Sequence, residues 1–172
     1  MLFSILALAL FGTSPAPQLD RLLVQTAGGV FGVQEPGGWT GYTDELAEHY
    51  QVSVVFLKTA ETPAKHDVSI RVRLTRKQDE QISEDLSADA QGYEASYPGL
   101  KRQPLPLAHP KYTVVSEAFL LPGRFSEYVA YVSPGPALPY MFSVALSVPN
   151  REATAAELAS LNTVLSSLAA IR

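Results

Sequence analysis

Hydrophobic and polar residues alternate most regularly over residues 68–75 of the chain. The apolar positions of this stretch are Val68, Ile70, Val72 and Leu74, and the positions between them include Arg71 and Arg73. A period of two is typical of a β-strand that buries one face, because successive side chains point to opposite sides of the strand. The pattern therefore predicts a strand here, and its second face, which carries both arginines, is expected to meet water or a partner.

Other strands are predicted where short apolar runs lie between turn residues. Residues 22–25 and 30–34 flank Gly28 and Gly29 and predict a hairpin that turns at the two glycines. Val52, Val54 and Phe56 follow at strand period, and residues 112–121, 125–133 and 140–148 predict three further strands. Residues 102–110 contain three prolines, which lack an amide donor, so this segment is predicted to be an extended connection or a sheet edge.

Two segments change to the period of a helix. In residues 78–97 the stripe consists of Ile82, Leu86, Ala90, Tyr93 and Tyr97, before Pro98 and Gly99. Near the C-terminus, Thr154 and Glu157 match a capping box, and the stripe that follows consists of Leu158, Leu161, Val164, Leu165, Leu168 and Ile171. A short helix to about Tyr50 is also expected, with the Thr43 hydroxyl as its cap. The order of elements predicts an α+β fold in which helices cover an antiparallel sheet, an α/β/α sandwich.

The N-terminal stretch, residues 2–11, is almost continuously apolar and ends at Gly12. A helix needs about 20 residues to cross a bilayer, so this run is too short to span one and is typical of a signal peptide. We expect residues 1–18 to be a signal peptide, residues 19–172 to form a single globular domain, and the protein to be exported to the periplasm or the extracellular space, with no transmembrane segment after processing. No Lys or Arg precedes the run, and a buried N-terminal helix is the alternative interpretation.

Composition excludes several classes of function. The 172-residue chain contains no cysteine, which excludes disulfides, thiolate metal sites and a cysteine nucleophile. Its net charge of -4 provides no overall attraction for nucleic acid, so nucleic-acid binding is not expected.

A likeness to a known family appears in the second half of the chain and around its only tryptophan. A strand that runs into Pro36, Gly37, Gly38 and Trp39, the strand 128–132, the segment 142–144 and the amphipathic terminal helix together resemble the PsbP/DcrB-like family over residues 30–172. Members of that family have an antiparallel sheet covered by helices and are mostly binding proteins. The resemblance implies binding rather than catalysis and carries over no functional residue, because the matching positions are packing positions.

Candidate catalytic groups are scattered. The three histidines, His49, His66 and His109, form no metal motif, although Glu45 and His49 are spaced to lie on one face of a helix. No serine lies in a nucleophile-elbow frame and no phosphate-binding loop is present in the sequence. The acidic cluster of Asp79, Glu80, Glu84 and Asp85 is interpreted as the solvent-exposed face of a helix. We therefore expect no catalytic residue, no cofactor and no metal.

The remaining candidates are residues for binding. Trp39 is interpreted as a core anchor rather than a stacking platform for a ligand. Arg71 and Arg73 are the candidate contacts with a partner, and the alternative is that they only keep an exposed strand soluble. Tyr128, Tyr131 and Tyr140 suit either an adhesive surface or an ordinary strand. The sequence favours an exported, non-catalytic binding or accessory protein with a protein partner; the alternatives are a small exported hydrolase whose site is assembled from distant residues, and a cytosolic chaperone for apolar segments.

Overall fold

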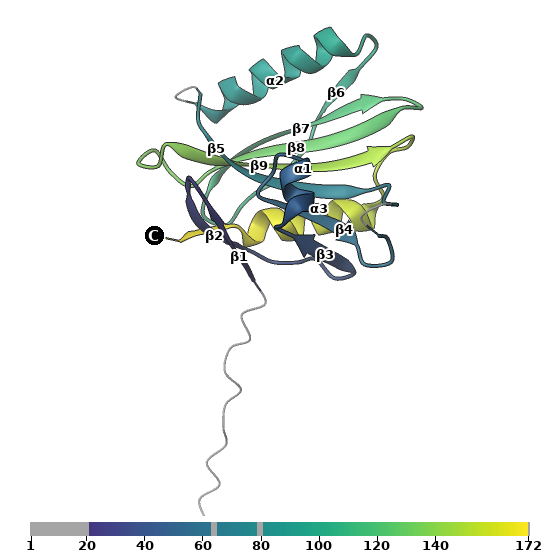
Figure 1. The fold of residues 1–172 in the computed structure, drawn as a ribbon. Coiled ribbons are helices and arrows are strands. Elements are labelled where there is room, and N and C mark those ends of the chain that lie inside the picture. Colours follow the sequence, from purple (N-terminus) through teal and green to yellow (C-terminus); the bar gives the residue numbers. More distant parts are fainter. Residues whose placement is uncertain (1–20, 63–64, 79–80, 172) are drawn as a thin grey trace, which may run out of the picture.

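The computed structural model describes residues 21–62, 65–78 and 81–171. The predicted signal peptide, residues 1–18, lies outside this part of the chain. The described residues form two antiparallel β-sheets and three helices (Figure 1). The predicted α+β architecture, an antiparallel sheet covered by helices, is confirmed.

The larger sheet has seven strands and the smaller sheet has three. In spatial order, the larger sheet consists of β3 (Trp39–Tyr42), β4 (Val54–Lys58), β5 (Ser69–Arg76), β9 (Tyr140–Pro149), β8 (Phe125–Ser133), β7 (Thr113–Leu121) and β6 (Lys101–Pro104). The smaller sheet places β2 (Gly29–Val33) between β1 (Leu22–Thr26) and β10 (Ala169–Ile171). The predicted hairpin at Gly28 and Gly29 is therefore confirmed. Residues 102–110 were predicted to be an extended connection or a sheet edge, and their first part belongs to the edge strand β6.

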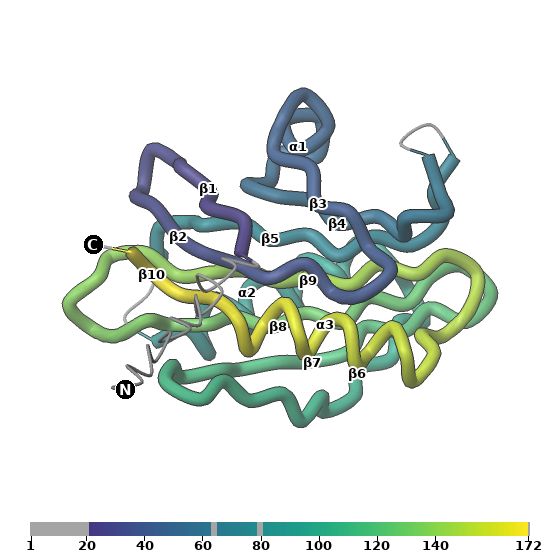
Figure 2. The backbone as a smooth tube through the Cα atoms, turned by 90° about the horizontal axis from the view of Figure 1, so that it is seen from below, coloured from purple at the N-terminus to yellow at the C-terminus, as the bar shows by residue number. Residues whose placement is uncertain are grey.

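The larger sheet has a different layer on each face. Helix α2 (Ile82–Ser96) lies above it in Figure 1, and α3 (Ala155–Ser167) lies below it together with the smaller sheet. Figure 2 shows α3 crossing beneath the sheet, with β10 following directly at its C-terminal end. The main core lies on the α3 side, where Trp39 is 7% exposed, so its predicted role as a core residue is confirmed. A smaller apolar cluster lies under α2.

Helix α1 (Glu45–His49) and strand β4 differ in detail from the sequence prediction. Asp44, not Thr43, caps α1, because its carboxylate accepts a hydrogen bond from the amide of Leu46. The strand predicted from Val52 begins at Val54, since Val52 donates its backbone amide to Ala47 at the end of α1. All apolar residues of β4 are buried, including those on the face next to α1, so this strand lacks the expected alternation.

The predicted stripe of α2 is confirmed at Ile82, Leu86 and Ala90, which are all buried. The interpretation of its acidic residues as a solvent-exposed face is wrong for Asp85, which is only 5% exposed. Its carboxylate accepts a hydrogen bond from the backbone amide of Gln78, so the buried group is paired. Glu84 is exposed as expected, while Asp79 and Glu80 lie outside the described residues.

The terminal helix α3 begins at its predicted capping box, in which Thr154 and Glu157 hydrogen-bond to each other's backbone amides. Its stripe ends earlier than predicted. Leu168 is the C-cap, and Ile171 is not part of the helix but of β10, where it is 44% exposed. The helix ends because the chain turns to pair with β2, and a pattern of apolar residues alone does not reveal that change.

A cluster of charges fixes the start of α3 to the sheet. Glu157 is 3% exposed, and its carboxylate accepts hydrogen bonds from Lys58 on β4 and from Arg151 in the loop before α3 at 2.6–2.8 Å. The hydrogen bonds from Arg151, supported by Lys58 and the amide of Thr154, hold the pKa of Glu157 well below its ordinary value. A buried carboxylate is stable only when it is paired in this way.

No helix in the described ranges is long and apolar enough to cross a membrane.

We predict that Leu165→Ala lowers the free energy of unfolding by about 2–5 kcal/mol, the usual cost of a cavity in a well-packed core. Leu165 is fully buried in the main core beneath the larger sheet. Urea unfolding checks this, with Asn162→Ala on the exposed face of the same helix as the matched control. A loss in Leu165→Ala no greater than in the control would show that α3 does not support the sheet.

We predict a pH dependence for the charge cluster at Glu157. Because its folded pKa is lowered, Glu157 contributes stability above its ordinary pKa near 4.5, and this contribution disappears as the pH falls below that value. Glu157→Gln should cost about 1–3 kcal/mol at pH 7, since Lys58 and Arg151 retain access to water, and less below pH 4. Urea unfolding of both proteins from pH 7 to pH 3 measures the difference, and a difference that does not change with pH contradicts the account.

Candidate functional site

The face of the larger sheet opposite α3 contains a groove whose floor is β9. Along this strand the side chains toward α3 are large and at most 1% exposed: Phe142, Val144, Leu146 and Val148. The side chains on the opposite face are small: Ser143, Ala145 and Ser147. Because alternate residues of a strand share a face, one strand both fills the core and leaves an open floor.

The two neighbouring strands provide the sides of the groove. Strand register places Arg71 of β5 and Val129 of β8 beside Ala145, and it places Arg73 and Tyr131 on either side of Ser143. These neighbours are longer than the floor residues and lie on the same face. The floor is therefore lower than both sides in the two rows of residues centred on Ser143 and Ala145.

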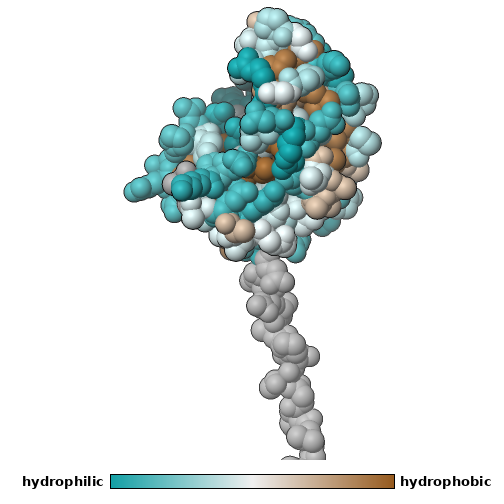
Figure 3. Space-filling model, turned by 90° about the vertical axis from the view of Figure 1, so that its right-hand side faces the viewer, coloured by the Kyte–Doolittle hydropathy of each residue, from teal (hydrophilic) through white to brown (hydrophobic). Residues whose placement is uncertain are grey.

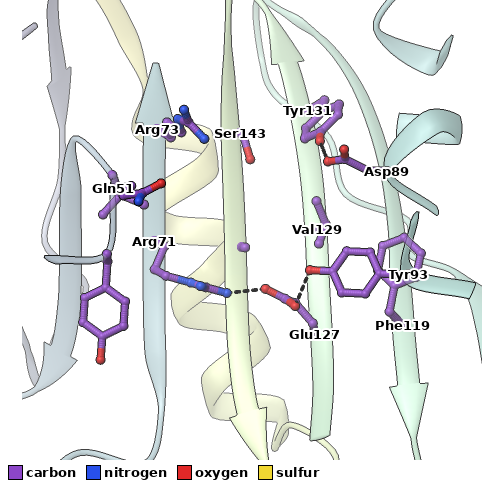
Figure 4. Close-up of a pocket in the computed structure, with 13 residues that line it drawn as sticks. Gln51, Arg71, Arg73, Asp89, Tyr93, Phe119, Glu127, Val129, Tyr131 and Ser143 are labelled. Atoms are coloured by element: carbon purple, nitrogen blue, oxygen red, sulfur yellow. Dashed lines mark hydrogen bonds and ion pairs between the residues drawn. The ribbon is translucent and has the colours of Figure 1, made fainter. Parts of the chain in front are cut away.

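Helix α2 and the turn after α1 complete the walls. Asp89 and Tyr93 of α2 line the groove on the β8 side, and residues 50–52 line it on the β5 side. Gln51 has a left-handed backbone (φ 55), through which the chain turns from α1 back toward β4. The resulting cavity has a volume of about 250 Å³ (Figure 4).

Arg71 crosses the floor of the groove. Its guanidinium reaches over β9 to form an ion pair with Glu127 of β8 (Figure 4). It also donates a hydrogen bond to Ser147. The Tyr93 hydroxyl donates to the other oxygen of Glu127 at 2.5 Å. Burial and the charge of Glu127 raise the pKa of Tyr93 far above its ordinary value, so this hydroxyl remains a donor. Arg71 and Glu127 are thus held by several partners, which leaves little freedom for either to bind a ligand.

Arg73 and Asp89 are arranged differently. They lie on opposite sides of the groove with Ser143 between them, and in the described part of the chain no ion pair joins them (Figure 4). Tyr131 donates a hydrogen bond to Asp89, and burial together with this bond raises the pKa of Tyr131 far above its ordinary value. Asp89 is therefore fixed in position, while the exposed guanidinium of Arg73 has no hydrogen bond to a described residue.

The two arginines chosen from the sequence do lie in one site, but their environments differ. Arg71 has a side chain that is 28% exposed and is committed to Glu127, whereas Arg73 is exposed. The expectation that this face of the strand meets water or a partner holds for Arg73 and only partly for Arg71. Their contact with a partner stays a prediction.

None of the three histidines lines the groove. His49 is exposed on α1, and His66 contacts the Tyr50 hydroxyl. His109 stacks on Tyr112 and bonds to the carbonyl oxygen of Leu168, and burial lowers its pKa. In the ranges that the structure describes, no group of three or more acidic or histidine side chains is placed to hold a metal ion.

Two of the three tyrosines singled out as candidates for an adhesive surface have buried roles. Tyr128 is 6% exposed and its hydroxyl accepts a hydrogen bond from the amide of Ala153, so it connects β8 to the loop before α3. Tyr131 is 5% exposed and lines the groove, and Tyr140 packs against Gly28 of the smaller sheet.

Sequence analysis missed Glu127, Asp89 and Tyr93 as site residues. A signal existed for Glu127, because it is the only charged residue in a strand of otherwise apolar and small polar residues. Asp89 and Tyr93 join the site through the packing of α2 on β7 and β8, which no local pattern specifies.

The groove has polar side chains of both charges but no arrangement for nucleophilic catalysis. None of the residues that line it is a histidine, and its two carboxylates already accept hydrogen bonds from tyrosines. Such an arrangement is suited to binding a polar group in a fixed orientation. A scan of the chain against protein-family models finds no matching family, and a search of the curated proteins finds no match either.

Proposed function

We propose that the protein is an exported, non-catalytic binding or accessory protein of the PsbP/DcrB-like type, and that an acidic segment of a protein partner docks over the groove above β9. The observation that carries the proposal is the incomplete cover of the larger sheet: α2 packs on β7 and β8, and the groove lies open beside it over β9 and β5. A sheet face left open and lined by polar and aromatic side chains is typical of a binding surface.

The charge of the partner is inferred from Arg73, the groove arginine that has no ion pair with a described residue. Arg73 has no ion pair in the described chain, while Arg71 is already paired with Glu127. This wall of the groove therefore has an unpaired positive charge, although the whole chain has a net charge of -4. Such a charge attracts an acidic partner locally.

The state of the Glu127 carboxylate supports binding over catalysis. A general base must have a lone pair available to accept the proton it removes. Both oxygens of Glu127 are occupied, one by Arg71 and Ser147 and the other by Tyr93. Arg71 and Tyr93 already satisfy this carboxylate. Glu127 therefore has a structural role, in which it links β5 to α2.

We predict that a photo-reactive benzoylphenylalanine at Gln51, on the wall of the groove, cross-links one partner in the native envelope. The same residue at Asn162, on the exposed face of α3, serves as the position control and should not yield that adduct. Arg73→Ser should lower the adduct yield several-fold at low salt and less at moderate salt, because exposed charges mainly steer association. Arg76→Ser is the matched control for charge and should change the yield less.

Folding should be nearly unaffected by Arg73→Ser, because an exposed arginine contributes less than about 1 kcal/mol to stability. Thermal unfolding of each variant checks this. Equal adduct yields from Gln51 and Asn162, or an Arg73→Ser yield equal to wild type at both salt concentrations, would contradict the docking site.

A further inference from the structure

One end of the groove is a compartment of limited length. The bridge from Arg71 to Glu127 crosses the floor at one end of it. At the other end, the next residue of β9 on the same face is Met141, which is 3% exposed and packs under α2. Between these two boundaries the floor consists of Ser143 and Ala145. The whole groove, of which this compartment is one end, has a volume of about 250 Å³, so the compartment is suited to a small molecule.

The compartment presents one positive and one negative side chain on opposite walls. Arg73 extends from β5 and Asp89 from α2, with Ser143 between them on the floor (Figure 4). The other two charges of the groove neutralise each other in the ion pair of Arg71 and Glu127. A small ligand between these two walls pairs with both side chains only if it carries a negative and a positive group.

We propose that this compartment binds a small zwitterion of the α-amino-acid class, with its carboxylate at the Arg73 guanidinium and its ammonium group at the Asp89 carboxylate. Arginine binds carboxylates through two parallel hydrogen bonds, which fixes the orientation of the ligand as well as its charge. The apolar part of the ligand then lies over Ala145 and Val129. This inference goes beyond the proposed function, since it requires no protein partner.

Preorganisation supports the assignment. Tyr131 holds Asp89 in place, and the carboxylate oxygen that does not accept this hydrogen bond is available to a ligand. Arg71 is held away from the compartment by Glu127 and Ser147, so it does not compete with Arg73 for the ligand carboxylate. Groups that are already fixed lose less entropy when a ligand binds.

The test is calorimetric titration of the full chain as purified after export with a panel of glycine, L-valine and L-glutamine. For the best binder, two derivatives remove one charge each: the N-acetyl derivative keeps only the carboxylate, and the methyl ester keeps only the ammonium group. We expect the parent zwitterion to bind and each derivative to bind at least about tenfold more weakly, equivalent to about 1.4 kcal/mol.

Variants then assign each charge to its side chain. Arg73→Gln and Asp89→Asn should each weaken binding of the zwitterion about tenfold. Arg76→Gln on the same strand and Glu84→Gln on the same helix are exposed, lie outside the compartment and should bind like wild type. A thermal unfolding curve for each variant confirms that it is folded.

The inference is overturned if no member of the panel binds at 10 mM, if a derivative binds as well as its parent, or if Asp89→Asn binds like wild type. Those outcomes leave the docking of a partner intact, because the cross-link from Gln51 is measured without an added amino acid. Conversely, loss of that cross-link while the zwitterion binds would remove the proposed function and keep the small-molecule site.

Discussion

The two faces of β9 impose opposite requirements on the residues of one strand. This strand is the middle one of the seven-stranded sheet, between β5 and β8. Toward α3 it must fill a core, and Phe142 and its alternate neighbours are large and buried. Toward the other layer it has only small side chains from Ser143 to Ser147, and α2 covers β7 and β8 instead. The alternation of large and small residues along β9 therefore produces tight packing on one face of the sheet and a groove on the other.

Figure 3 shows the outer surface of this layered arrangement. Most of it is polar, and apolar side chains are visible near its top, where α2 lies over the sheet.

Electrostatics explains why the two arginines of β5 have different roles. A partly buried charge is costly unless it is paired, and Arg71, which lies over the floor, is paired with Glu127 and Ser147. Arg73 is two residues further along the strand and is exposed, so water can solvate it without a protein counter-ion. The first arginine therefore contributes to the shape of the groove, and the second remains available for a ligand. The same rule applies at Glu157, which is nearly inaccessible and has two cationic partners.

Most of the fold could be predicted from local patterns, because its strands and helices are amphipathic and its turns contain Gly and Pro. Strand β8 has the predicted bounds, and the α3 capping box is where Thr154 and Glu157 indicated. Predictions were wrong where a tertiary contact overrides the pattern: Ile171 pairs with β2, and Asp85 is buried and accepts a hydrogen bond from the amide of Gln78. In the site, Arg71 and Arg73 could be found from alternation alone. Glu127 and Asp89 could not be connected to them, since strand register and the packing of α2 bring these residues together.

The central claim is that the small side chains of β9 keep a binding groove open. The most direct measurement is to fill it with Ser143→Phe and then determine both the cross-link from Gln51 and the binding of the zwitterion, with Asn162→Phe on α3 as the control. The account predicts that Ser143→Phe abolishes both while the free energy of unfolding changes by less than about 1 kcal/mol, because Ser143 lies outside the main core. Ser143→Leu repeats the test with a smaller side chain if the phenylalanine impairs folding. A folded variant with a filled groove that retains both the cross-link and the zwitterion would contradict the account.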